Sequence, residues 1–363
     1  MTDLYNVSGY KKSLDVIGGC VDHVFLSIPR ITKPFTPTRN ISRSEYEKQV
    51  DFYFENGYVD NPTRFFTLDD TVPEHRIIED TPYKDGRYQV LTFKSRHQVK
   101  NPMIKARYAS FEANKTACLV RWIHPEPTGK TLVCLHGYML GEPTQAHKMF
   151  HISRLYDMGL DIALFITPFH WQRAPENPAQ RGIFVQTNDA PMSCEAMGQS
   201  MTDLNSCLLI LDRLGAGEIG LIGASLGGYN ASLYSCLSDR HSFAAMMVPA
   251  INFSKPYGPA FAKHTFTIDP AFMEKITKVW ELPSPLNHTP KLSTDRMLFV
   301  ASRGDRLCPF EYLEQLHKKW HFTRFRYMTG GHWLVFNGKE RGRAWYSFLS
   351  DMGFTPGQQK KRH

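Results

Sequence analysis

The chain has 363 residues, 42% of them apolar and 21% charged, and a formal net charge of +8. This composition is typical of a globular protein with a sizeable core, and it excludes an intrinsically disordered chain. Lys360, Lys361 and Arg362 at the tail supply part of the positive charge, and the rest is spread along the chain. Because the sequence has neither paired Cys/His ligands nor a glycine-aromatic RNA-binding run, it does not predict nucleic-acid binding.

The cysteines and the lack of long apolar runs indicate the cellular compartment of the protein. The seven cysteines are odd in number, no two have C-x-x-C spacing, and several lie in apolar segments. This use of cysteine favours free thiols in a reducing compartment. No window of about 18 apolar residues occurs, and no apolar run of signal-peptide type follows the N-terminus. We therefore expect a cytoplasmic protein without a transmembrane helix.

The predicted elements alternate between helices and strands. Helical patterns come first, at residues 10–27 and 44–56, and proline-bearing connections follow them. From residue 87 onward, runs of strand length recur at residues 87–95, 118–125, 130–138, 160–168, 219–225, 243–251 and 296–302. Helical stretches at residues 144–158, at 195–214 and from 226 onward separate several of these runs. Fully apolar strands joined by helices belong in a parallel sheet covered on both faces, so we expect an open, mostly parallel α/β sheet.

The domain organisation follows from the same patterns. Residues 1–104 are predicted to be an N-terminal helical extension that packs on the core, residues 105–353 the α/β domain, and residues 354–363 a basic tail. The stretch at about 254–292 is too long for a plain crossover, and its prolines and helical piece indicate a small inserted cap near the carboxyl edge of the sheet. Its aromatic residues either form an apolar acyl site or pack on the core: Phe253, Tyr257, Phe261, Phe266, Phe272 and Trp280.

One serine lies between two glycines directly after an apolar run, in Gly223-Ala224-Ser225-Leu226-Gly227. A sharp strand-to-helix turn needs residues without side chains two positions before and after the serine, and it lifts the hydroxyl above the sheet. The turn also brings Ser225 to a helix N-terminus, where backbone N–H groups favour negative charge. We predict that Ser225 is a nucleophile. The alternative is a glycine-rich helix start that only packs closely.

A serine nucleophile needs a base and an acid, which in this topology follow it in the order acid, histidine. Asp305 follows the apolar run at 296–302 in a G-D-x-x-x-P turn, and its alternative role is that of a turn residue only. His332 follows an apolar stretch and two glycines, on a loop that can reach both other groups. We predict that Asp305 orients His332, which takes the proton from Ser225.

The developing oxyanion needs two backbone N–H donors. The N–H of Leu226, directly after the nucleophile, is one predicted donor. The second is predicted in the loop after the strand at 130–135, where Gly137 lets the chain turn inward; Tyr138 is the first choice and Met139 the second. His136 is expected to support this loop rather than transfer protons, and His136 and Met139 are also candidates for substrate contact.

Together, His136-Gly137, the Ser225 motif, Asp305 and Gly331-His332 resemble the α/β-hydrolase superfamily over about residues 105–350. The resemblance implies the α/β-hydrolase fold, with a twisted, mostly parallel sheet of about eight strands flanked by helices. It also implies that no metal or organic cofactor is used.

A shorter run, Pro168-Phe169-His170-x-x-Arg173, is similar to one in a subgroup of α/β-hydrolase-domain-containing proteins. On that resemblance, His170, Trp171 and Arg173 are expected to line the substrate pocket at the end of a sheet strand. Arg173 then either pairs with a substrate anion or pins the long loop that follows it.

The sequence therefore predicts a serine hydrolase that cleaves a carboxylic ester or thioester through an acyl-enzyme, with a small-molecule or lipid-like acyl substrate. Acyl transfer or peptide cleavage on the same triad is one alternative, and a non-catalytic binding protein of this fold is another. For the helical piece at residues 16–29, peripheral membrane contact is an alternative to ordinary packing. The oligomeric state is not predicted.

Overall fold

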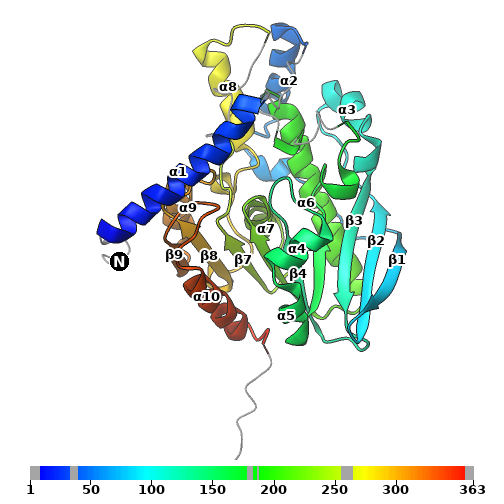
Figure 1. The fold of residues 1–363 in the computed structure, drawn as a ribbon. Coiled ribbons are helices and arrows are strands. Elements are labelled where there is room, and N and C mark those ends of the chain that lie inside the picture. The colour runs from blue at the N-terminus through cyan, green and yellow to red at the C-terminus, as the bar shows by residue number, and fades with distance from the viewer. Residues whose placement is uncertain (1–8, 33–39, 178–182, 186–187, 255–264, 356–363) are drawn as a thin grey trace, which may run out of the picture.

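A nine-stranded sheet runs through the middle of the molecule in the computed structural model (Figure 1). The structure describes residues 9–32, 40–177, 183–185, 188–254 and 265–355. Along the sheet the strands are ordered β1-β2-β3-β5-β4-β6-β7-β8-β9. Their bounds are β1 His75–Tyr83, β2 Gly86–Lys94, β3 Thr116–Ile123, β4 Lys130–Leu135, β5 Asp161–Phe165, β6 Glu218–Ala224, β7 Phe243–Met247, β8 Met297–Ser302 and β9 Arg324–Met328.

The sheet is parallel from β5 and β4 through β9, and β1, β2 and β3 extend it as antiparallel strands. This confirms the predicted mostly parallel sheet, with nine strands rather than about eight. The predicted runs do not include β1 and β9, because nearly all side chains of β1 are exposed and only one side chain of β9 is fully buried. β1 and β2 pair into the same sheet as β3, so the sheet begins inside the segment 1–104 that was predicted to be an extension.

Helices flank the sheet (Figure 1). Their bounds are α1 Gly9–Thr32, α2 Arg43–Glu55, α3 Pro102–Ala109, α4 Pro143–Met149, α5 Ile152–Asp157, α6 Ala190–Arg213, α7 Leu226–Leu237, α8 Pro270–Glu281, α9 Phe310–Trp320 and α10 Gly338–Asp351. The predicted helix at 144–158 is divided into α4 and α5, because His151 between them has a left-handed backbone with φ of 54°.

Successive residues of the central strands face two separate apolar clusters. In β4, Val133 and Leu135 belong to one cluster, and Leu132 and Cys134 belong to the other. The first cluster joins the sheet to α6, α7, α8 and α9, and the second joins it to α4, α5 and α10. Because side chains alternate along a strand, these two clusters are the two faces of the sheet, and helices cover both.

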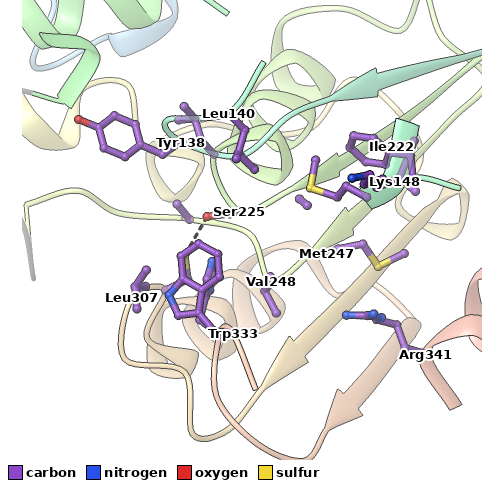
Figure 2. Close-up of a pocket in the computed structure, with 18 of the residues that line it drawn as sticks. Tyr138, Leu140, Lys148, Ile222, Ser225, Met247, Val248, Leu307, Trp333 and Arg341 are labelled. Carbon is purple, nitrogen blue, oxygen red and sulfur yellow. Dashed lines mark hydrogen bonds between the residues drawn. The ribbon is translucent and has the colours of Figure 1, made fainter. Parts of the chain in front are cut away.

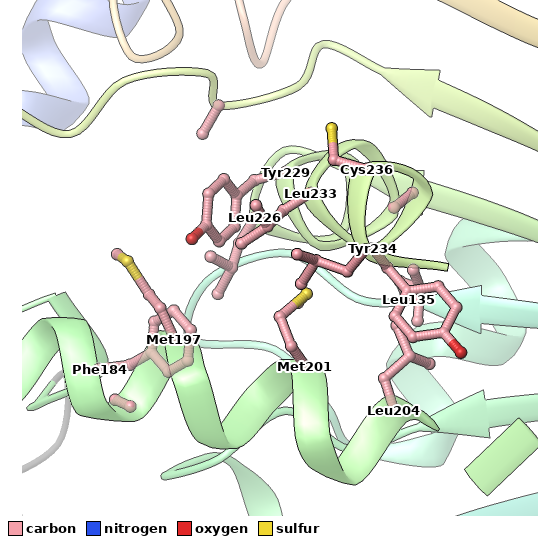
Figure 3. Packing of buried hydrophobic residues seen from close by; sticks show 14 of the residues in the cluster. Leu135, Phe184, Met197, Met201, Leu204, Leu226, Tyr229, Leu233, Tyr234 and Cys236 are labelled. Atoms are coloured by element: carbon pink, nitrogen blue, oxygen red, sulfur yellow. The ribbon is translucent and has the colours of Figure 1, made fainter. Parts of the chain in front are cut away.

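The long helix α6 is buried along almost its whole length. On one side, Met197 and Met201 of α6 face Leu226 and Tyr229 of α7 (Figure 3). On its other side, α2, α3 and α8 contact it. The N-terminal segment therefore covers the helix that supports α7, and α7 begins directly after Ser225.

None of the helices in the described part of the chain has the length and hydropathy to span a membrane. Of the predicted cap, residues 255–264 lie outside the described residues, and Tyr257 and Phe261 with them. The described part contains α8, which packs against α2 and α6. Phe272 and Trp280 of α8 are buried in the first apolar cluster, so they pack on the core rather than form an acyl site.

Candidate active site

Ser225 lies at the sharp junction between β6 and α7. Its backbone has φ of 55° and ψ of −113°, a strained conformation for a residue with a side chain. A Cβ on Gly223 would come 2.1 Å from the carbonyl oxygen of Gly227, and one on Gly227 would come 1.8 Å from that of Leu135. The close approach of strand and helix therefore requires glycine at both positions, as the sequence pattern predicts.

Asp305 and His332 meet in the loops that follow β8 and β9. Asp305 Oδ2 lies 2.7 Å from His332 Nδ1, and both side chains are almost completely buried. The other carboxylate oxygen accepts hydrogen bonds from the backbone N–H groups of Leu307 at 2.9 Å and Cys308 at 2.7 Å. These bonds fix the carboxylate, so it orients the imidazole with the Nε2 atom left for another partner.

Cys308 is a member of this site that the sequence analysis did not single out. Its Sγ lies 3.9 Å from Ser225 Oγ, and its side chain also contacts the imidazole of His332. Within the described part of the chain, no hydrogen bond joins Ser225 Oγ directly to His332. In substrate-free serine hydrolases, catalytic hydrogen bonds are often long and tighten only on binding. Cys308 follows Asp305 by three residues in the same turn, and this spacing is the sequence feature from which its place in the site could have been predicted.

Burial and nearby charge act in opposite directions on His332. Burial lowers the pKa of the imidazole, but the hydrogen-bonding contact with Cys308 and the charge and hydrogen bond of Asp305 raise it above the usual value of 6.5. Burial raises the pKa of the Cys308 thiol, so the thiol is protonated at neutral pH. Asp305 is therefore the group that supplies the negative charge stabilising a cationic His332.

The two chain segments predicted to supply oxyanion donors both lie close to Ser225. Leu226 is the first helical residue of α7, and the N–H group of such a residue has no acceptor within its own helix. The loop after β4 comes close to the serine, because a Cβ built on Gly137 would lie 3.8 Å from Ser225 Cβ. Tyr138 and Met139 follow in this loop, and Met139 has a left-handed backbone with φ of 63°. Both predicted donor segments, Leu226 and the loop with Tyr138 and Met139, therefore line the same cavity as Ser225.

A cavity of about 820 Å³ opens beside Ser225 (Figure 2). Ser225, Leu226, Tyr138, Met139 and His332 all line it. Most of its other walls are apolar, including Leu140, Ile222, Met247, Val248, Phe253 and Trp333. Three cationic side chains that the sequence analysis did not single out also line it: Lys148, Arg154 and Arg341. Lys148 and Arg154 lie on the neighbouring helices α4 and α5, and only the fold brings Arg341 of α10 to the same cavity.

The other predicted substrate contacts are not among the residues that line the cavity. His136 is fully buried; its Nδ1 lies 2.8 Å from the carbonyl oxygen of Gly137, and its Nε2 accepts the Thr167 N–H at 3.1 Å. Burial lowers the pKa of His136 to about 3, so the ring is neutral and ties the loop after β4 to the loop after β5. This is the supporting role that the sequence analysis favoured for it.

His170, Trp171 and Arg173 do not line the cavity either, which corrects the expectation drawn from the Pro-Phe-His-x-x-Arg run. Arg173 is 1% exposed and pairs with Asp203 at 2.6 Å. It also donates to the carbonyl oxygen of Ile166 at 2.9 Å. The guanidinium therefore pins the loop after β5 to α6, which is the second of its two predicted roles. The physical reason is that Arg173 turns toward α6, while the ring of His170 lies behind Tyr138, at 5.7 Å between ring centroids, and Tyr138 lines the cavity in its place.

The residues of the site also include ligand types for a metal. The ligand atoms of Asp305, Cys308 and His332 lie within 4.8 Å of one another. The same groups already engage each other, since His332 bonds Asp305 and contacts Cys308. The arrangement is therefore accounted for by an acid–base pair with an adjacent thiol.

Comparison with known families agrees with the fold. Residues 94–271 match a family model described as "Alpha/beta hydrolase domain containing 18". Uncharacterized proteins from two strains of Mycobacterium tuberculosis are similar along most of the chain. The protein from strain CDC 1551 is 24% identical over 346 residues, and that from strain H37Rv is 23% identical. Both alignments cover 94% of this chain and 83% of the relative.

Two solved structures have a similar fold. Acetyl xylan esterase 1 from Thermoanaerobacterium sp. JW/SL YS485 has a TM-score of 0.59 at 13% identity, covering 86% of this chain and 99% of the esterase. An acetyl xylan esterase from Paenibacillus sp. R4 has a TM-score of 0.54 at 13% identity, with the same coverage. At this identity the likeness concerns the fold alone, and that fold is the α/β-hydrolase fold.

Proposed function

We propose that this chain, which has the α/β-hydrolase fold, is a serine hydrolase that cleaves a carboxylic ester or thioester. Ser225 is the nucleophile, His332 the general base and Asp305 the group that orients His332. The backbone N–H groups of Leu226 and Tyr138 form the oxyanion hole.

One observation carries the proposal. Ser225, with its strained backbone at the β6–α7 turn, lines the same cavity as His332, and the buried Asp305 carboxylate lies 2.7 Å from the His332 ring. A strained turn costs about 1–3 kcal/mol, and such strain is retained where the surrounding structure over-determines it, often at functional sites. A merely close-packed helix start would not need an oriented histidine beside the same cavity.

The mechanism follows from the positions of these groups. Neutral His332 removes the proton from the Ser225 hydroxyl, and the oxygen attacks the acyl carbonyl to form a tetrahedral intermediate. The Leu226 and Tyr138 N–H groups stabilise its negative oxygen, and His332 then protonates the leaving alkoxide or thiolate. Water, activated by His332, releases the acyl group in a second cycle.

The cavity supports an acyl substrate with a substantial apolar part. Its volume of about 820 Å³ lies in the range of sites that enclose a drug-sized ligand. Its apolar walls favour a lipid-like acyl chain over a small acetyl group. Two proteins of similar fold are named acetyl xylan esterases, which supports ester cleavage as the reaction but does not define this substrate.

A fluorophosphonate probe tests the proposal directly. Wild-type protein is expected to be labelled, and Ser225→Ala is expected to lose both labelling and ester hydrolysis, with a fall in kcat on the order of 10⁴–10⁶. Ser232→Ala is the matched control, because Ser232 lies on the same helix and its hydroxyl only bonds the carbonyl of Gly228. Labelling that persists in Ser225→Ala, or is absent from the wild type, would refute the serine mechanism.

The acyl preference has its own test. Hydrolysis of p-nitrophenyl esters of increasing chain length, from acetate to palmitate, should favour the longer chains. A sharp preference for acetate would leave the serine mechanism intact and would argue against a lipid-like substrate.

A further inference from the structure

The N-terminal helix α1 lies against the loops that follow β8 and β9. One of its residues, Asp22, is completely buried. Its carboxylate accepts hydrogen bonds from three backbone N–H groups, those of His332 at 2.7 Å, Arg306 at 3.0 Å and Trp333 at 3.2 Å. The side chain of Asp22 thus links the loop that carries His332 to the loop that carries Asp305.

The backbone of α1 packs so closely against the two loops that no side chain fits at the points of contact. A Cβ on Gly18 would come 2.0 Å from the backbone nitrogen of Gly331, and one on Gly304 would come 2.2 Å from the carbonyl oxygen of Asp15. Asp15 also accepts the N–H of Gly330 at 2.8 Å. The backbone of α1 therefore lies directly against both loops, and glycines on both sides make this approach possible.

The two loops have few other connections near the triad. The N–H of Gly304 donates to the carbonyl oxygen of Gly330 at 3.0 Å, and Ser302 Oγ donates to the same oxygen at 2.5 Å. Both bonds lie on the strand side of Asp305 and His332. Beyond them, the backbone N–H groups of Arg306 and His332 share one oxygen of Asp22.

We propose that Asp22 is a positioning residue: it sets the distance and angle between Asp305 and His332 from outside the hydrolase core. This proposal rests on the proposed function, in which that pair activates Ser225. Asp22 touches neither substrate nor the reacting atoms, and it acts through the backbone of the two catalytic loops. A displacement of about 1 Å in a catalytic group can lower the rate by about 10²-fold, so the loss of this link should affect the chemical step.

Asp22→Ala removes the acceptor of all three backbone N–H groups. The expected result is a fall of about 10²-fold in kcat and in the fluorophosphonate labelling rate constant, with KM changed little. Asp22→Asn retains an acceptor oxygen that can replace the one shared by Arg306 and His332. It should therefore recover most of the rate, to within about two- to tenfold of the wild type. Ser13→Ala, at an exposed hydroxyl of the same helix, is the control and should behave as the wild type.

A merely structural role predicts a different pattern. Asp22→Ala would then lower the melting temperature and the labelled fraction, while the rate constant of the labelled fraction stayed at the wild-type value. That result would overturn the proposal. If Asp22→Ala does not fold, Asp22→Asn decides: labelling and kcat equal to those of the wild type, or a change in KM alone, would also overturn it.

A measurement that needs no substrate separates this proposal from the proposed function. The Nδ1–H proton of His332, bonded to Asp305, should give a far-downfield proton NMR signal in the wild type. The signal should be lost or shifted in Asp22→Ala and retained in Ser13→Ala. If the wild type is not labelled by the probe, the proposed function fails, and this signal still tests the link. An unchanged signal in Asp22→Ala would contradict the proposal.

Discussion

Two regions of this molecule use the same residue types for different purposes. Around α6, His97 Nε2 lies 3.0 Å from Glu195 and Arg173 lies 2.6 Å from Asp203, with all four side chains nearly or completely buried. Beside the cavity, His332 and Asp305 form a pair of similar length that is buried to a similar degree. Neither residue type, distance nor burial distinguishes the two regions.

What differs is the surroundings of each pair. The carboxylates themselves are alike: Glu195 accepts the backbone N–H groups of Lys100 and Asn101, Asp203 accepts the hydroxyl of Ser95, and Asp305 accepts the N–H groups of Leu307 and Cys308. His332, in contrast, faces a cavity that also contains a serine with a strained backbone. A buried ion pair is therefore no indicator of a site by itself, and access to a cavity beside a strained nucleophile is the informative feature.

The largest expected effect on the pair beside the cavity is the loss of activity in Asp305→Asn. By analogy with other triads, kcat should fall about 10⁴-fold, because the imidazole loses the charge and the acceptor that orient it. The pH dependence should change as well. Only neutral His332 accepts the serine proton, and its pKa is raised, so kcat/KM of the wild type should rise with pH through a value above 6.5. In Asp305→Asn this limb should move to lower pH.

The pH–rate profiles of both proteins measure this prediction. Asp203→Asn serves as the matched control, because it alters a buried carboxylate of α6 away from the cavity. It should lower the stability of the protein and leave the acidic limb of the pH–rate profile in place. A limb that stays in place in Asp305→Asn would mean that Asp305 is not the partner that raises the pKa of His332.

The next largest effect is a loss of stability, expected from Arg173→Leu in the region around α6. This change leaves Asp203 buried without its cation, so the free energy of unfolding should fall by about 3–5 kcal/mol. Urea denaturation measures it, with Lys278→Ala as the control, since the exposed pair of Lys278 with Glu274 should contribute less than about 1 kcal/mol. A rise in KM without loss of stability would instead indicate that Arg173 contacts the substrate.

The smallest expected effect is that of Cys308→Ala. The thiol is protonated at neutral pH and supplies neither charge nor nucleophile, so the variant should keep most of the wild-type activity. Alkylation of wild type by iodoacetamide should nevertheless block fluorophosphonate labelling, because the added group would lie beside Ser225 and His332. Inactivation should be faster at higher pH, since only the thiolate reacts.

Cys308→Ala should resist this inactivation. Equal inactivation of the variant and the wild type would assign the effect to another thiol, such as the exposed Cys20. That outcome would remove Cys308 from the description of the site.

The sequence by itself determined the features that local geometry dictates. The glycines around Ser225 are required by contacts within the turn and with the adjacent strand, so the pattern could be read without a structure. The buried strands of the parallel sheet can be recognised in the sequence as apolar runs. Asp305 and His332 could be predicted because each follows a strand, and the carboxyl ends of parallel strands meet at one edge.

Only the tertiary structure decided the rest, because it depends on contacts between distant segments. Strand β1 has no apolar pattern and forms only by pairing with β2. Whether Arg173 faces the cavity or α6 depends on the path of a loop, which residue types do not encode. The link from Asp22 to the backbone of His332 joins residues 310 positions apart. A backbone N–H group has no identity in the sequence, so the partner of a buried carboxylate becomes visible only after the chain has folded.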